Sequence, residues 1–157
     1  MNKENKKDLE AFKKLKNVLY EEGWEPEIIE DHKACRLNCN LENISVVLYT
    51  RILSDIDQFI VYVTSSISVQ KYQLNIAGEY LNRVNYGLRV ASFEMNYEDG
   101  EVRCKGCIDF EGEVLSKIYI RNIIYLVLKT ADYYFPGLAI VLQDLKTIDE
   151  VIAELEA

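Results

Sequence analysis

The chain has 157 residues, of which 49% are hydrophobic and 28% are charged. These fractions exclude a disordered protein, and the length suits one domain that buries roughly 70% of the unfolded chain's surface. Eighteen basic and 26 acidic residues give a formal net charge of −8, so the surface repels phosphate backbones. We expect a single domain over residues 1–157 that does not bind nucleic acid.

The sequence contains no segment typical of secretion or membrane insertion. The N-terminus lacks the apolar core of a signal peptide. The longest apolar stretch, residues 118–128, is interrupted by Arg121 and Asn122 and is far shorter than the ~20 residues that span a bilayer. We therefore expect a cytoplasmic protein without membrane contact, in which the four cysteines are free thiols.

Apolar periodicity predicts an α+β fold in which helices pack on one face of an antiparallel sheet. Gly23 is placed to end the first helix, Pro136-Gly137 to end the third, and Thr147 with Glu150 forms a capping box for the last. The predicted order is helix 3–22, three or four strands between 24 and 64, helix 69–86, a hairpin with strands 88–97 and 102–110, helix 114–134, and a helix from 147.

The hairpin determines whether Cys104 and Cys107 could form a chemical site. Asp99-Gly100 lies between two alternating apolar runs, which predicts a two-residue turn and places Met95 opposite Cys104. Since successive strand side chains alternate between faces, Cys104 should point into the core and Cys107 away from it. The two thiols then cannot share a metal ion or form a disulfide.

The same register pairs Glu94 with Lys105 across the strands. A bulge at Gly106 would overturn it, because glycine inside a strand often marks one. Cys35 and Cys39 could complete a four-cysteine zinc set, but they lie in an apolar strand face. We interpret all these cysteines as structural and expect no metal and no cofactor.

No catalytic constellation is recognisable. His32 is the only histidine and falls in a predicted polar turn between strands, where an exposed turn residue is the simpler interpretation. No glycine-rich phosphate loop occurs. We therefore expect no catalytic residues and no enzymatic activity.

Tyrosine is abundant, with 11 residues in the chain, and four of them belong to the third predicted helix. That helix is apolar around more than one stripe, which is typical either of deep burial or of an interface. Both interpretations stay open. The candidate interface residues are Tyr119, Tyr125, Tyr133 and Tyr134.

Several linked segments resemble the YbjN-like family. They cover about two thirds of the chain, although Ala91-Ser92 departs from the Gly-Asn that often precedes Phe93 in such proteins. The segments are Gly23-Trp24, residues 81–88 leading into 91–95, residues 99–105 and 108–112, and residues 131–138 with the pattern D-x-Y-x-P-G.

The resemblance implies a fold like that of type III secretion chaperones, which are small acidic homodimers that bind partner proteins. It also implies the descriptive label of a bacterial sensory transduction regulator. Our hypothesis is a non-enzymatic, homodimeric module with a regulatory or chaperone-like role, which binds an unknown partner protein through an apolar surface. The alternative is a small-ligand sensor with a pocket between the sheet and the helices.

Overall fold

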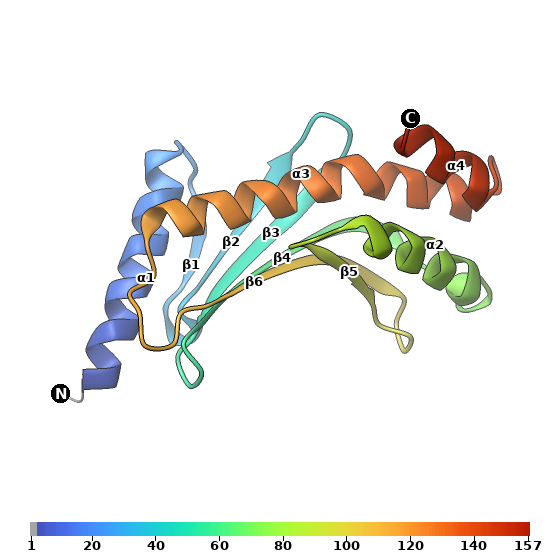
Figure 1. Ribbon diagram of the computed structural model, residues 1–157. Helices are drawn as coiled ribbons and strands as arrows, with labels where there is room; N and C mark the ends of the chain where they lie inside the picture. Colours follow the sequence, from blue (N-terminus) through green and yellow to red (C-terminus); the bar gives the residue numbers. More distant parts are fainter. Residues whose placement is uncertain (1–2) are drawn as a thin grey trace.

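A six-stranded antiparallel sheet carries the helices on one of its faces (Figure 1), as the α+β prediction requires. The computed structural model describes residues 3–157. Its elements are α1 (Lys3–Glu21), β1 (Glu27–Ile29), η1 (Glu30–His32), β2 (Ala34–Asn40), β3 (Ser45–Leu53), β4 (Gln58–Ser68), η2 (Lys71–Gln73), α2 (Leu74–Gly87), β5 (Ser92–Met95), β6 (Glu101–Asp109), α3 (Lys117–Leu142) and α4 (Ile148–Leu155).

The strands lie in the order β1-β2-β3-β4-β6-β5, and every neighbouring pair is antiparallel. Between its first and last strands, the chain leaves the sheet for an α-helix once: α2 follows β4, and the β5–β6 hairpin then completes the sheet. The β4–β6 register shifts between Thr64 and Ser68. Such an irregularity bends the strand, which agrees with the curved sheet in Figure 1.

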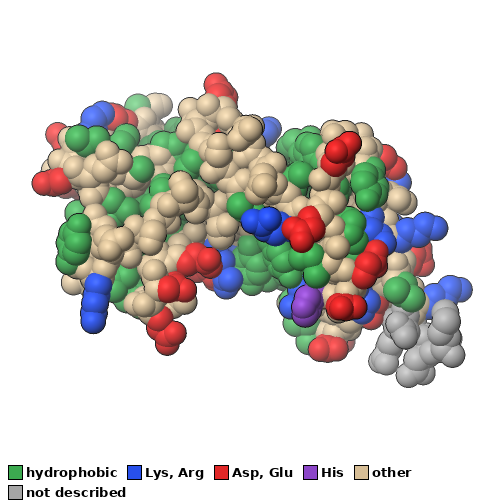
Figure 2. Space-filling model, turned by 180° about the vertical axis from the view of Figure 1, so that it is seen from behind, with side chains coloured by type: hydrophobic (Ala, Val, Ile, Leu, Met, Phe, Trp, Pro, Cys, Tyr) green, Lys and Arg blue, Asp and Glu red, His purple; other side chains and the backbone are tan. Residues whose placement is uncertain are grey.

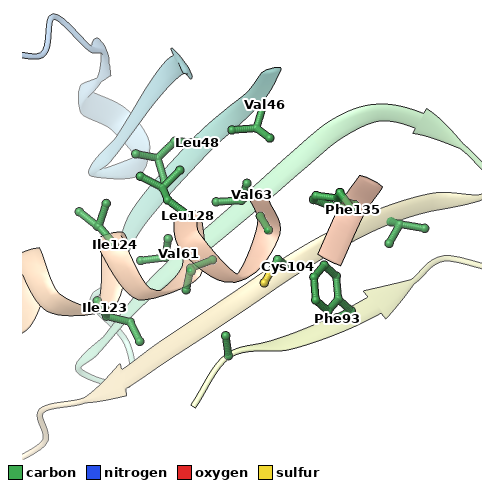
Figure 3. Packing of buried hydrophobic residues seen from close by; sticks show 14 of the residues in the cluster. Val46, Leu48, Val61, Val63, Phe93, Cys104, Ile123, Ile124, Leu128 and Phe135 are labelled. Carbon is green, nitrogen blue, oxygen red and sulfur yellow. The ribbon is translucent and has the colours of Figure 1, made fainter. Parts of the chain in front are cut away.

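Alternation along the strands divides the sheet into a buried face and an open face. In β3, and in β4 as far as Val63, every second side chain is buried, for example Leu48, Val61 and Val63. These side chains meet Ile124 and Leu128 of α3 in one hydrophobic cluster (Figure 3). The side chains between them are half-buried or exposed, since no helix of the described chain covers their face.

Gly106 brings α3 close to the sheet. A Cβ atom there would lie 2.6 Å from Cγ2 of Val127 and 2.8 Å from Cδ1 of Ile123, well inside van der Waals contact. Gly106 pairs regularly with Val61, so no bulge occurs at this position. The glycine therefore serves helix–sheet packing, a role that its place in a strand did not reveal.

The predicted two-residue turn is wrong. Met95 faces Val102, and a four-residue loop over positions 97–100 closes the hairpin, with the Gly100 N–H donating to the Asn96 carbonyl at 2.8 Å. Gly100 has a φ of +76° while Asp99 does not take a positive φ, so the tight turn that needs both cannot form. Val69 also donates its N–H to the Gly100 carbonyl, which ties the loop to the main body.

The register shift is two residues, so every side chain keeps its predicted face. Cys104 is buried and Cys107 is exposed, as predicted. Glu94 now lies opposite Arg103 and also accepts a hydrogen bond from Lys105 at 2.6 Å. The expected charge pairing across the strands is therefore kept, with Arg103 as an additional partner.

The prediction that Pro136-Gly137 ends the third helix is wrong, because α3 continues through both residues. Proline inside a helix costs ~3 kcal/mol, so tertiary contacts must offset it. A Cβ at Gly137 would lie 2.4 Å from Oη of Tyr80 and 2.9 Å from Cγ1 of Val151. The Tyr80 hydroxyl donates to the Tyr134 carbonyl at 2.7 Å. Close packing against α2 and α4 therefore stabilises the helix beyond the proline.

The second helix begins later than predicted. Residues 71–73 form the 3-10 turn η2, in which the side chains and backbones of Gln70 and Gln73 cap one another, and α2 starts at Leu74. The apolar periodicity of a helix over residues 69–86 predicts that Tyr72 and Ile76 are buried. This prediction is wrong, because they are 85% and 38% exposed. Because the first turn of the predicted helix is not α-helical, the buried residues of α2 begin at Ala77.

We expect Gly106→Ala to destabilise the protein by ~1–3 kcal/mol, because the added methyl group overpacks the contact with α3. Urea unfolding measures this change. Gly87→Ala is the matched control, since nothing lies within 4 Å of a Cβ there and its φ is not positive. Equal stabilities of the two variants would contradict the role assigned to Gly106.

Candidate functional site: an apolar cleft beside β2

The second half of β2 is the least covered part of the sheet's buried face. α3 packs on β4 and β6, α1 on β3, and α2 on β5, while no helix covers β2 to a similar extent. Along β2 the inward side chains become progressively less buried: Cys35 is buried, but Leu37 and Cys39 are only half-buried. α3 alone covers ~10 Å of a sheet whose six strands span ~29 Å, so coverage of the outer strands depends on where α1 and α2 lie.

A cleft of about 630 Å³ occupies this strip. Its floor is the inward face of β2, one wall is the connection from α1 to β1, and the other wall is α3. The floor and walls are largely apolar, and the polar residues lie at the rim. The lining residues are Gly23, Trp24, Glu25, Leu37, Asn38, Cys39, Asn40, Leu41, Glu42, Tyr125, Leu128, Lys129 and Asp132.

Trp24 and Tyr125 form one end of the cleft and are fixed by a charged network. Their ring centroids are 5.7 Å apart at an interplanar angle of 48°. The Tyr125 hydroxyl donates to Glu22, which also forms a salt bridge with Arg121. The hydrogen bond from Tyr125 and, after it, the charge of Arg121 lower the pKa of Glu22 below its ordinary value, whereas the same hydrogen bond raises the pKa of Tyr125.

Asp132 fixes the opposite end of the cleft by hydrogen bonds. Its carboxylate accepts hydrogen bonds from the backbone N–H of Asn43 at 2.8 Å and from Nδ2 of Asn43 at 2.9 Å. Asn43 lies in the turn between β2 and β3, so this contact ties that turn to α3. Both ends of the cleft are thus fixed by polar contacts, while its floor stays open.

The four cysteines are free thiols in different environments. Burial raises the pKa of Cys35 and of Cys104 to about 12. Burial also raises the pKa of Cys39, which lies in the cleft, and of Cys107. Such pKa values are the opposite of those of reactive thiols, so the geometry supports the structural interpretation of the cysteines.

Within residues 3–157 no three His, Cys, Asp or Glu side chains are grouped so that they could hold a metal ion. His32 lies exposed in η1, as the turn prediction expected. No helix of this part of the chain is long and apolar enough to cross a membrane.

The four candidate tyrosines do not form one surface. Tyr119 and Tyr133 are 61% and 48% exposed and share the outer side of α3, about 21 Å apart along the helix. Tyr133 donates to the Leu155 carbonyl at 2.6 Å. Tyr134 packs edge-on against Phe93, and only Tyr125 lines the cleft. Their role as an interface remains a prediction.

The cleft arises from the placement of the helices, which the sequence does not reveal. Strand alternation predicts that Leu37, Cys39 and Leu41 share one face, but it cannot show that α1 and α3 leave them partly uncovered. Trp24 was a usable signal, since the chain's one tryptophan directly follows a helix-ending glycine and such a residue is seldom fully buried.

Comparison with known proteins gives a family and a fold. The model of the family YbjN, described as "Putative bacterial sensory transduction regulator", matches residues 12–139. None of the curated proteins matches the chain.

Two solved structures are similar in fold. One is "YbjN, a putative transcription regulator from E. coli", with 12% identity and a TM-score of 0.54, over 75% of this chain and 83% of that chain. The other is an uncharacterized protein from Methanothermobacter thermautotrophicus, with 17% identity and a TM-score of 0.50, over 85% of this chain and 97% of that chain. At such identities the likeness shows the fold alone.

We expect alkylation to modify Cys107 first and Cys39 second. Cys35 and Cys104 should react only on unfolding, because burial keeps them protonated and inaccessible. Mass spectrometry after timed exposure to iodoacetamide gives the order. In denaturant all four thiols should react alike, and rapid labelling of Cys104 in the folded protein would contradict the hairpin faces.

Tyr125→Phe should raise the pKa of Glu22 towards its ordinary value, because the strongest stabilising hydrogen bond to the carboxylate is lost. A carboxyl whose pKa is lowered by folding stabilises the protein above its unfolded-state pKa of ~4.3, and this contribution disappears as the pH falls through the folded-state pKa. The stability difference between wild type and variant should therefore shrink on acidification. Carboxyl NMR titration and urea unfolding across the acid range measure both effects.

Proposed function

Because the chain belongs to the YbjN family, we propose that it is a non-enzymatic regulatory module that binds a partner protein through the cleft beside β2. One observation carries this proposal: the cleft is open to solvent and yet is lined by apolar side chains, with Leu37 and Leu41 in its floor and Leu128 in the α3 wall. Apolar side chains at an open, concave position gain free energy when a partner removes them from water.

A non-enzymatic role is supported by the chemistry of the lining. The cleft contains no histidine, and its one cysteine has a raised pKa. The Asp132 carboxylate is already engaged by Asn43. These groups suit binding better than proton transfer or nucleophilic attack.

We further propose that the protein acts in the cytoplasm, as a homodimer, and without nucleic acid. On the face in Figure 2, side chains of both charge signs are mixed with hydrophobic ones, and the described residues form no broad basic area there. For the dimer contact, Tyr119, Leu126 and Tyr133 offer an exposed, largely uncharged side of α3, to which the candidate interface of Tyr119, Tyr125, Tyr133 and Tyr134 would contribute.

A small-ligand sensor is the second candidate, favoured by the size of the cleft. A volume of about 630 Å³ falls within the range of ~300–1,000 Å³ typical of ligand pockets. Lys129, which is exposed at the rim, could orient a polar ligand. The open shape of the cleft favours a protein segment, because a small molecule there stays partly in water.

Partner binding is tested with a charge placed in the cleft. We expect Leu41→Glu to weaken binding of a partner, first captured from the native host and then purified, by roughly tenfold or more, since a buried carboxylate opposes apolar contact. The matched control is Val47→Glu, because Val47 is also half-buried but points to the opposite face of the sheet. Calorimetry measures affinity, and thermal unfolding confirms that both variants fold.

Unchanged affinity of Leu41→Glu would refute the cleft as the binding surface. If instead a small metabolite stabilises the wild type against heat but not Leu41→Glu, and no protein binds, the sensor alternative is correct.

A further inference from the structure

The outer edge of β2 has free backbone groups where it borders the cleft. The Leu41 N–H donates to the Ile44 carbonyl and the Ile52 N–H donates to the Lys33 carbonyl, both at 3.0 Å. Odd-numbered residues from 33 to 41 therefore direct their backbone groups towards β3, and even-numbered residues direct theirs away from it. Asn38 and Asn40 thus present an N–H and a carbonyl each to the outer edge.

β1 pairs with only the first part of that edge. The β1–β2 ladder ends at the pair Glu27 and Arg36, and no hydrogen bond within the described residues reaches the backbone of Asn38 or Asn40. The next residue to bond in this ladder would be Glu25, opposite Asn38, and no hydrogen bond joins these two backbones. Gly23, with a φ of +78°, directs the chain from α1 towards β1. No strand of the described chain therefore lies beside Asn38 and Asn40, and we call this open strand position next to the second half of β2 the lane.

We propose that this lane accepts an extended segment of a partner protein as an additional antiparallel strand. The inference rests on the proposed function and specifies how the partner is held. The partner's backbone pairs with Asn38 and Asn40. Asn38 and Asn40 also line the cleft although their side chains point to the opposite face, so the edge and the cleft form one site.

The alternation of β2 defines the partner's sequence. Cross-strand neighbours share a face. Because β1 and Pro26 occupy the edge as far as Leu37, the partner residues opposite Cys39 and Leu41 are those that point into the cleft, and they should be apolar. Those opposite Asn38 and Asn40 point to the exposed face and should be polar.

Charge defines one end of the segment. Glu25 and Glu42 lie at the rim of the cleft, are exposed, and form no salt bridge within residues 3–157. A basic residue next to the two apolar positions, opposite Glu42, would complement them. A second copy of this chain fits less well, because it would bring another acidic surface with its own Glu25 and Glu42 to the same edge.

A synthetic peptide of about five residues, Lys-Val-Thr-Val-Thr with blocked ends, provides the probe, since its extended length of ~17 Å matches the free edge opposite residues 38–42. Binding should change the fluorescence of Trp24, the chain's one tryptophan. It should protect the amides of Asn38 and Asn40 from hydrogen exchange, whereas the amides of Leu37 and Cys39 already bond to β3 and should not change. A small ligand or an isolated side chain in the cleft would not give this alternating pattern.

Two matched pairs test the backbone contacts. N-methylation of both threonines, whose N–H groups face β2, should weaken binding by about tenfold or more, while N-methylation of the valines should not. Asn38→Pro removes the outward N–H at a position where an edge strand tolerates proline, and Asn38→Ala keeps it, so only the proline variant should lose the peptide. Replacing the lysine by glutamate should also weaken binding, mostly at low salt.

The inference is overturned if the peptide does not bind, if neither amide is protected, or if both N-methylated peptides bind equally. If the peptide does not bind but Leu41→Glu still weakens capture of the partner, strand addition is refuted while the proposed function stands. Capture that does not depend on Leu41 refutes the proposed function, whatever the peptide does. Dimerisation that Asn38→Pro abolishes would identify a second copy as the occupant and would also overturn the inference.

Discussion

The close approach of α3 to the sheet at Gly106 is the constraint on which the rest of the structure depends. It places a helix of ~39 Å over β4 and β6, on the side of the sheet away from β1 and β2, where Phe59, Val61 and Cys104 are fully buried. One helix cannot cover six strands, so α1 and α2 cover parts of the remainder on either side. The second half of β2 stays only partly covered, and the cleft follows from this division.

Much of the fold could be predicted because it depends on local signals. Strand alternation assigned Cys104 and Cys107 to opposite faces, and the capping box at Thr147 marked the start of α4. The hairpin shows why such assignments tolerate errors: its loop is two residues longer than Asp99-Gly100 suggested, but an even shift leaves every side chain on its face. Local patterns therefore predict the sheet face to which a side chain points more reliably than they predict which residues pair across two strands.

The errors arose where tertiary contacts override local preference. Pro136 and Gly137 both disfavour a helix, yet α3 continues because Tyr80 and Val151 pack tightly against it there. The cleft was missed for the same reason, since coverage of β2 depends on helices far away in the sequence. The family is recognisable from linked strand segments, whereas the site depends on surfaces that no segment specifies alone.

An unpaired strand edge is a liability, because it can pair with any extended chain and cause aggregation. Here the exposed part is short, lies beside acidic Glu25 and Glu42, and is flanked by Pro26, which limits what can pair with it. The other edge strand, β5, has only four residues. A protein that blunted both edges completely would have filled the lane next to Asn38 and Asn40. This lane is empty, and the carboxylates of Glu25 and Glu42 lie beside it. Because these carboxylates repel acidic chains and attract basic ones, the arrangement is consistent with an edge that binds selected partners.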